Sequence, residues 1–95
     1  EYLSGTCSAY TSNGGYTATG KKAQVGYVAV DPDVIPYGTE LYICSADGKF
    51  VYGYAIAADT GGAMQSGRIL ADLYYDTVAQ CYNFGLREMR VYILD

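Results

Sequence analysis

Three aspartates in this sequence follow apolar, strand-like runs. Asp31 follows Val-Ala-Val, Asp59 follows Ile-Ala-Ala, and Asp72 follows Leu-Ala. A charge at the end of an apolar strand is costly unless it is paired, hydrogen-bonded or used. Because the chain has no histidine, carboxylates are the best remaining candidates for proton transfer near neutral pH. The pattern therefore indicates acid and base chemistry at aspartate.

The composition is that of one small β-rich domain. Ninety-five residues allow one hydrophobic core but no second independent lobe, so residues 1–95 are expected to form a single domain. Twelve tyrosines and twelve glycines against two prolines favour short strands joined by tight turns. The chain begins with Glu1 rather than Met, and we therefore expect it to be part of a longer exported protein.

The charge of the chain argues against two classes of partner. The net charge is −4, and the six Lys and Arg residues are scattered apart from Lys21-Lys22 and the pair Arg87 and Arg90. Such a surface has no continuous basic patch that could bind the phosphates of a nucleic acid. It is equally unsuited to an anionic membrane. No apolar stretch approaches the roughly 20 residues needed to span a bilayer. We expect neither nucleic acid nor membrane as a partner, and the oligomeric state stays open.

Metal and cofactor motifs are weak in this sequence. Cys7, Cys44 and Cys81 lack C-x-x-C spacing, and without histidine a zinc site is not expected. Residues 15–21 match the start of a phosphate-binding loop but are not followed by the required Ser or Thr. We expect no metal and no cofactor, although several aspartates together could hold a hard cation. The cysteines are expected to be buried hydrophobes or, in an exported protein, to include a disulfide between Cys7 and Cys81.

Hydrophobic alternation and turn residues predict six short strands and one helix. Thr77 and Gln80 fit a capping box and Gly85 a C-terminal stop, so the helix is expected near residues 77–84. The apolar run 24–30 indicates a strand buried on both faces, and a glycine-rich loop is expected after Asp59. A small closed barrel would remove the exposed strand edges. The expected strands are residues 3–11, 24–30, 40–44, 50–58, 68–75 and 87–94, with 40–58 forming a hairpin.

The segment around Asp59 has an alternative interpretation. Ile-Ala-Ala followed by Asp59-Thr60-Gly61 is similar to the active-site motif of aspartic proteases, in which two aspartates share a proton. One chain of this length holds a single copy of the motif, so such an enzyme would have to be a dimer. That interpretation leaves the settings of Asp31 and Asp72 unexplained.

Six segments, taken together and in order, resemble the 3D domain. This family is named for three aspartates and is related to the catalytic barrel of the MltA-type lytic transglycosylases. The likeness extends over most of the chain and is more specific than any single motif. The segments are Val28-Ala-Val-Asp31-Pro, Val34-Ile-Pro-Tyr-Gly-Thr39, Gly53-Tyr-Ala-Ile-Ala-Ala-Asp59-Thr-Gly-Gly-Ala63, Asp72-Leu-Tyr-Tyr-Asp-Thr77, Asn83-Phe-Gly85 and Val91-Tyr-Ile-Leu94.

The resemblance implies a six-stranded double-psi β-barrel that acts on peptidoglycan glycan strands at the bacterial cell wall, outside the cell. Enzymes of this type cleave the β-1,4 bond between N-acetylmuramic acid and N-acetylglucosamine without water and leave a 1,6-anhydro ring. By position, Asp31, Asp59 and Asp72 match the three family aspartates, and Asp72 corresponds to the proposed acid and base. The alternative on the same barrel is a noncatalytic module that binds cell-wall glycan.

The sequence departs from the family pattern just before Asp72. Two extra residues, Leu70 and Ala71, precede this aspartate, and Gln65 replaces the usual lysine. An insertion of two residues within a strand keeps each side chain on its face, so Asp72 is expected to point into the site. Asp76 is the alternative acid, but its place beside the helix cap explains it better.

The expected mechanism gives the aspartates unequal roles. Asp72 would protonate the glycosidic oxygen and then accept the proton of the muramic acid C6 hydroxyl. Partial burial and the charge of Asp59 would keep it protonated, while Asp59 steadies positive charge at C1. Asp31 would either orient the other two or cap a turn. The residues expected to contact the substrate are Tyr10, Thr19, Gly20, Tyr54, Gly61 and Gly62.

Overall fold

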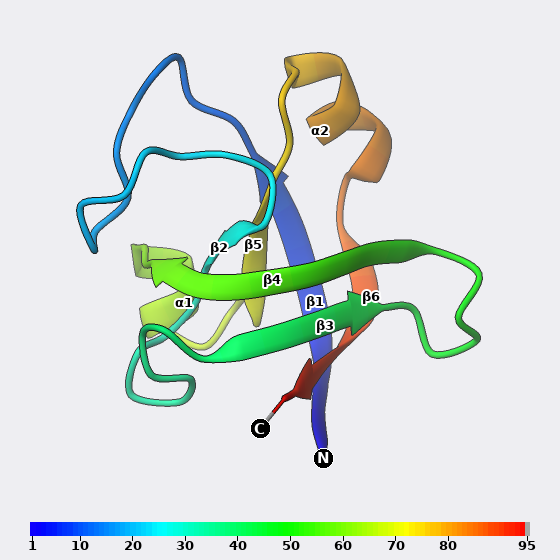
Figure 1. The fold of residues 1–95 in the computed structure, drawn as a ribbon. Coiled ribbons are helices and arrows are strands. Elements are labelled where there is room, and N and C mark those ends of the chain that lie inside the picture. The colour runs from blue at the N-terminus through cyan, green and yellow to red at the C-terminus, as the bar shows by residue number, and fades with distance from the viewer. Residues whose placement is uncertain (95) are drawn as a thin grey trace.

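A closed barrel of six strands forms the body of the protein (Figure 1). The computed structural model describes residues 1–94. The order around the barrel is β1-β5-β2-β4-β3-β6, with β6 pairing back to β1. The pairs β1/β5 and β2/β4 are parallel and the others antiparallel, which confirms the predicted six-stranded double-psi barrel. The elements are β1 (Tyr2–Tyr10), β2 (Tyr27–Ala29), β3 (Glu40–Cys44), β4 (Val51–Asp59), α1 (Gly62–Gln65), β5 (Ala71–Tyr74), α2 (Val78–Phe84) and β6 (Arg87–Ile93).

The core fills the inside of the barrel with alternate side chains of each strand. Inward residues are aliphatic or sulfur-containing, and their outward neighbours are mainly polar residues and tyrosines, as the two-residue period of a strand requires. The fully buried core side chains with the largest volume are Ile35, Leu41, Ile43, Leu73, Met89, Val28, Val30, Val91 and Cys7.

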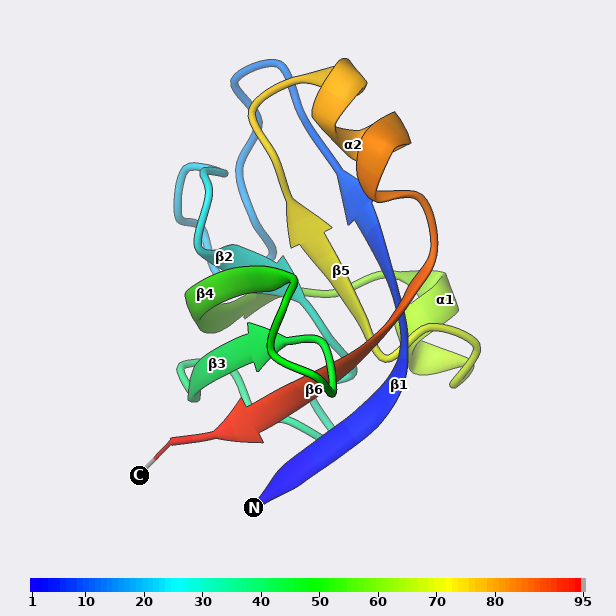
Figure 2. The ribbon, with the colours of Figure 1, turned by 90° about the vertical axis from the view of Figure 1, so that its right-hand side faces the viewer.

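Two of the predicted elements have the expected positions. β3 and β4 form the predicted antiparallel hairpin. Helix α2 begins after Thr77, whose hydroxyl accepts from the Gln80 N–H while the Gln80 side chain accepts from the Thr77 N–H. Gly85 ends the helix with a φ of 63°. Helix α2 lies at one end of the barrel, and the two chain ends lie together at the other (Figure 1 and Figure 2). Neither helix among the described residues is long and apolar enough to cross a membrane.

The strand predicted over residues 24–30 is shorter than expected. Only Tyr27–Ala29 pairs as β2, because Gly26 has a φ of 102° and turns the chain just before it. Val28, Ala29 and Val30 are all buried, so the expectation of burial on both faces holds for this part.

The segment before Asp72 also differs from expectation. The glycine-rich loop contains a second helix, α1, which its buried residue Met64 anchors to the barrel. The strand predicted over 68–75 begins only at Ala71, because the N–H groups of Arg68 and Ile69 bond to the Ala63 carbonyl in the turn that follows α1. The extra residue Leu70 packs over Gly5. A Cβ atom added to Gly5 would lie only 3.2 Å from the Leu70 Cβ.

The expected disulfide between Cys7 and Cys81 is not formed. All three cysteines are free thiols. Cys7 is enclosed in the barrel core with no exposed surface, whereas Cys81 lies on α2 and lines a groove outside the barrel. The interpretation of Cys7 and Cys44 as small buried hydrophobes is confirmed.

Candidate active site

Asp59 and Asp72 lie on the two strands that flank β2. Ala29 of β2 pairs with Asp72 on one side and with Asp59 on the other. Since neighbouring strands are about 4.8 Å apart, the two aspartate Cα atoms are separated by roughly 10 Å. The neighbours Ala71 and Leu73 are fully buried in the core, so Asp72 projects from the outer face of the barrel.

Asp72 combines partial burial with a single recorded hydrogen bond. The Ser8 hydroxyl, from the neighbouring strand β1, donates to Asp72 Oδ1 at 2.9 Å. Burial raises the pKa of Asp72, the Ser8 hydrogen bond opposes this shift, and the negative charge of Asp59 adds to it. The second carboxyl oxygen, Oδ2, has no hydrogen bond among the described residues. Asp72 is thus a carboxyl group whose pKa is raised and which has one oxygen available to a ligand.

Asp59 is fixed by backbone donors. Its Oδ1 accepts from the N–H groups of Thr60 and Ala18, each at 2.9 Å. The predicted residue Thr19 supports this arrangement, because its hydroxyl donates to the Ala58 carbonyl at 2.9 Å and holds the loop against the end of β4. Gly20 completes the loop with a φ of 86°. Thr19 and Gly20 therefore lie beside Asp59, as part of the loop that orients it.

Tyr10 lies close to both carboxylates. Its hydroxyl donates to the Tyr27 carbonyl at 3.4 Å, and its ring contacts Tyr74 edge-on at a centroid distance of 5.4 Å. Burial, followed by the charges of Asp59 and Asp72, raises the pKa of the Tyr10 phenol. Tyr10 therefore brings a neutral hydroxyl to the site.

An open groove runs beside these residues between the end of β1 and helix α2. Tyr10 lines this groove and lies two residues along β1 from Ser8, the residue that donates to Asp72. The sequence analysis missed Ser8, Cys81 and Tyr82 as site residues. The outward position that Ser8 shares with Tyr10 on β1 was the available signal for Ser8. The groove is lined by Ala9, Tyr10, Thr11, Val78, Cys81, Tyr82 and Gly85.

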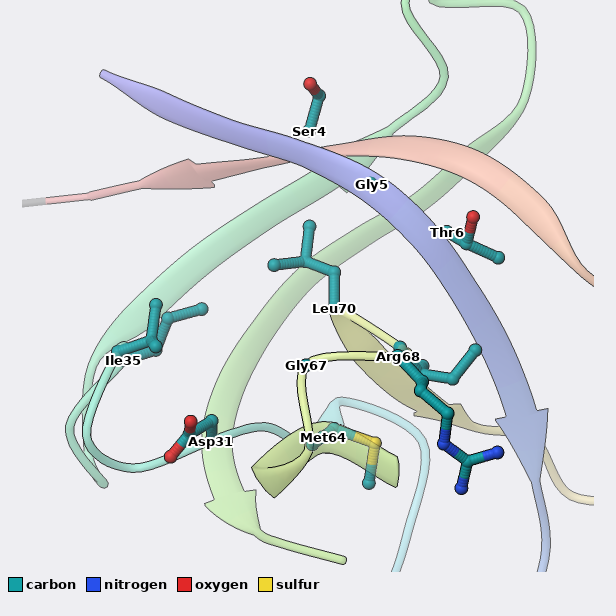
Figure 3. A pocket seen from close by; sticks show the side chains of 11 residues that line it. Ser4, Gly5, Thr6, Asp31, Ile35, Met64, Gly67, Arg68 and Leu70 are labelled. Carbon is teal, nitrogen blue, oxygen red and sulfur yellow. The ribbon is translucent and has the colours of Figure 1, made fainter. Parts of the chain in front are cut away.

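Asp31 does not line this groove. It lines a separate hollow together with Met64 and Arg68 (Figure 3). Its carboxylate accepts from the Asp33 N–H at 3.0 Å, and its backbone carbonyl accepts from Val34 and Ile35, which is the pattern of a turn. Of the two roles expected for Asp31, the geometry matches the turn cap.

The remaining predicted contacts do not reach the groove. Tyr54 lies in the middle of β4, five residues before Asp59, or about 17 Å along the strand. Gly61 precedes helix α1, and a Cβ there would lie 3.0 Å from the Met64 Cε, so this glycine makes room for a packing contact. Gly62 is exposed and has no atom within 4 Å of a Cβ built on it.

Comparison with solved structures finds the same fold in a known enzyme. The structure of MltA from E. coli superimposes with a TM-score of 0.68 and 22% identity, covering 87% of this chain and 28% of MltA. A variant of the E. coli lytic transglycosylase MltA in an apo form gives a TM-score of 0.62 and 24% identity over the same shares.

Two curated relatives come from Bacillus subtilis (strain 168). The cell wall-binding protein YocH is 38% identical over 98% of this chain and 32% of its own length. The putative cell wall shaping protein YabE is 36% identical over 94% of this chain and 19% of its own length. The chain thus spans a third or less of these relatives. The family model of the 3D domain matches residues 26–95, and the chain belongs to the 3D domain family.

Proposed function

We propose that this domain is a peptidoglycan lytic transglycosylase in which Asp72 is the single general acid and base. The observation that carries the proposal is the environment of Asp72. Burial and the nearby charge of Asp59 raise its pKa, Ser8 holds Oδ1, and Oδ2 has no hydrogen bond among residues 1–94. A general acid for glycoside cleavage needs a carboxyl group that keeps its proton and can present it to the leaving oxygen.

One carboxyl group suffices when the nucleophile belongs to the sugar itself. Asp72 gives its proton to the glycosidic oxygen, and the bond between that oxygen and C1 of the muramic acid breaks. The C6 oxygen of the same sugar then bonds to C1, and its proton passes to the Asp72 carboxylate. The proton count balances, no water enters, and the acid is regenerated with a 1,6-anhydro ring as product.

Asp59 and Tyr10 would assist from fixed positions. Two backbone N–H groups hold the Asp59 carboxylate, whose charge stabilises the positive charge that develops at C1. The Tyr10 phenol, which stays neutral, can donate a hydrogen bond to a sugar oxygen in the groove. Both groups are in place before the substrate binds, so little reorganisation is needed.

The relatives support a cell-wall setting for this chemistry. Both curated relatives carry cell-wall names, and the solved structure with the same fold is a lytic transglycosylase. We infer that the domain works outside the cell on the glycan strands of peptidoglycan. The family match covers Asp59-Thr60-Gly61, so the proposal does not require the protease interpretation of these residues.

A second candidate is a noncatalytic module that binds cell-wall glycan. It is favoured by the name of the relative YocH, which describes binding. It is also favoured by Gln65, which replaces the family lysine and donates to the Thr60 hydroxyl at 3.2 Å.

Digestion of purified peptidoglycan, with mass spectrometry of the fragments, separates the two candidates. The wild-type domain should release anhydro-muropeptides, and Asp72→Asn, which retains the shape of the side chain, should release none. Asp76→Asn is the matched control, because it removes an exposed carboxylate four residues away and should leave the products unchanged. Full activity in Asp72→Asn would refute the mechanism, and binding without products from the wild type would favour the module.

A further inference from the structure

Four tyrosines form a row across the outside of the barrel, far from the candidate active site. Tyr2 pairs with Tyr92, Tyr92 with Tyr42, and Tyr42 with Tyr54, on the adjacent strands β1, β6, β3 and β4. At about 4.8 Å per strand the row is roughly 14 Å long. The row begins at Tyr2 on β1. Ser8, which donates to Asp72, lies six residues further along this strand, a distance of about 20 Å.

The rings of this tyrosine row lie on the surface. The inward neighbours Leu41, Ile43 and Val91 have no exposed surface, so the tyrosines between them point outward. Tyr54 is 76% exposed and Tyr2 is 44% exposed. The rings pack in two pairs, with centroids 5.1 Å apart for Tyr2 and Tyr92 and 5.0 Å apart for Tyr42 and Tyr54. An open groove lies along the row and is lined by Tyr42, Cys44, Tyr54, Tyr92 and Leu94.

A cation is built into one end of the row. The Arg90 guanidinium lies 4.4 Å from the centre of the Tyr2 ring and donates to the Tyr92 hydroxyl at 3.4 Å. These contacts hold a positive charge on the surface of a domain whose net charge is −4. Glu40 follows the same outward face of β3 beyond Tyr42, on the other side of the row from Arg90. The tyrosine row is thus an aromatic surface with charged residues on both sides. It differs in this from the interface of a permanent dimer, which is a continuous apolar surface.

We propose that the tyrosine row is a second binding site for a peptidoglycan glycan strand, a proposal that rests on the proposed action of the domain on the cell wall. A β-1,4-linked glycan is a linear polymer with apolar C–H faces and hydroxyl-rich edges. Exposed tyrosines match both features, because the ring offers an apolar face and the hydroxyl a hydrogen-bonding edge. Arg90 complements the carboxylates of the peptide stems that the glycan carries. The site holds the domain on the insoluble polymer while the Asp72 groove engages another part of it.

The test measures co-sedimentation with purified, insoluble peptidoglycan, using chains that all carry Asp72→Asn so that cleavage cannot alter the polymer. Tyr54→Ala and Tyr2→Ala should each weaken binding by about tenfold, as expected when an aromatic contact is truncated. Tyr16→Ala is the matched control, because its ring is 73% exposed but lies in the loop after β1, and it should bind as the parent does. Thermal melting checks that each variant is folded.

Arg90→Gln tests the charge. It should weaken binding to peptidoglycan that carries its peptide stems but not binding to chitotetraose, which has no carboxylate. Unchanged co-sedimentation of both tyrosine variants would overturn the proposal. So would a dimer of the parent chain, seen by sedimentation velocity, that Tyr54→Ala dissociates, since the row would then be covered by a second copy.

The outcome for the tyrosine row can be read separately from that for Asp72. In chains with intact Asp72, Tyr54→Ala should still yield anhydro-muropeptides from soluble glycan fragments. Loss of co-sedimentation with these products retained supports the second site. If the wild type yields no anhydro products at all, the proposed function fails, whereas a selective loss of binding in Tyr54→Ala still supports the row.

Discussion

Replacing Tyr52 by phenylalanine should destabilise the barrel although the change removes a single oxygen atom. The Tyr52 hydroxyl donates to the Tyr74 carbonyl at 2.8 Å and accepts from the Gly26 N–H at 2.9 Å. Burial raises the pKa of this phenol to about 12. The ring contacts Tyr75 edge-on at a centroid distance of 5.4 Å, and this contact survives the substitution. The variant therefore isolates the two hydrogen bonds that join the start of β2 to the end of β5.

The size of the effect follows from those two bonds. Each hydrogen bond contributes about 0.5–1.5 kcal/mol net, so their loss should lower the free energy of unfolding by about 2 kcal/mol. For a domain of about 100 residues, 1 kcal/mol corresponds to a shift of roughly 4–8 °C in melting temperature, so Tm should fall by about 10 °C. Thermal and urea unfolding, followed by circular dichroism at pH 7, measure both quantities.

Tyr54→Phe provides the control on the same strand. Its side chain is 76% exposed and its hydroxyl has no hydrogen bond among the described residues. The substitution should therefore change the free energy of unfolding by no more than about 0.5 kcal/mol. If Tyr52→Phe lowers the free energy of unfolding by no more than this control does, the bridging hydroxyl does not stabilise the barrel and the reasoning is refuted.

Four further results are expected around the site. Ser8→Ala removes the hydrogen bond that lowers the pKa of Asp72, so the pH at which lytic activity declines should move upward in a pH–rate profile, whereas Ser8→Thr should retain the wild-type profile. Asp72→Asn should raise Tm at pH 7: the folded pKa of Asp72 lies above its unfolded value near 3.9, so its ionisation costs stability as pH rises, and the gain should vanish near pH 3. Thr77→Ala removes the N-terminal cap of α2, so the free energy of unfolding measured with urea should fall by about 1 kcal/mol. Asp31→Asn should leave the yield of anhydro products within about threefold of wild type, since a loss of the 10²–10⁴-fold typical of proton transfer would make Asp31 catalytic.

Local sequence signals were sufficient for the elements that depend on their own neighbours. Helix α2 could be predicted because Thr77, Gln80 and Gly85 act within one short segment. Helix α1 could not, because a pair of glycines disfavours a helix and the burial of Met64 is evident only in the folded barrel. Likewise, the positive φ of Gly26, which shortens β2, is set by contacts with β4 and the Tyr52 hydroxyl.

The candidate site could be predicted only in part, for a related reason. The three aspartates were recognisable by their apolar flanks and by the family pattern. Ser8 was not, because it meets Asp72 through a parallel pairing between residues 64 positions apart. Tyr54 was expected to contact the substrate, whereas its pairing with Tyr42 sets it in a row of tyrosines that only the strand order around the barrel brings together.

The single strand between Asp59 and Asp72 has a chemical consequence. Ser8 draws Asp72 toward β1 on one side, and Ala18 and Thr60 hold Asp59 on the other, while the backbone of β2 separates them. Two carboxyl groups that share one proton need oxygen atoms about 2.6 Å apart, and this arrangement pulls them away from each other. The charge of Asp59 thus raises the pKa of Asp72 while the backbone of β2 stays between the two residues. The hydrogen bonds of β2 to its two neighbouring strands set the distance between the backbones of Asp59 and Asp72. Side-chain substitutions at the two acids leave this distance unchanged.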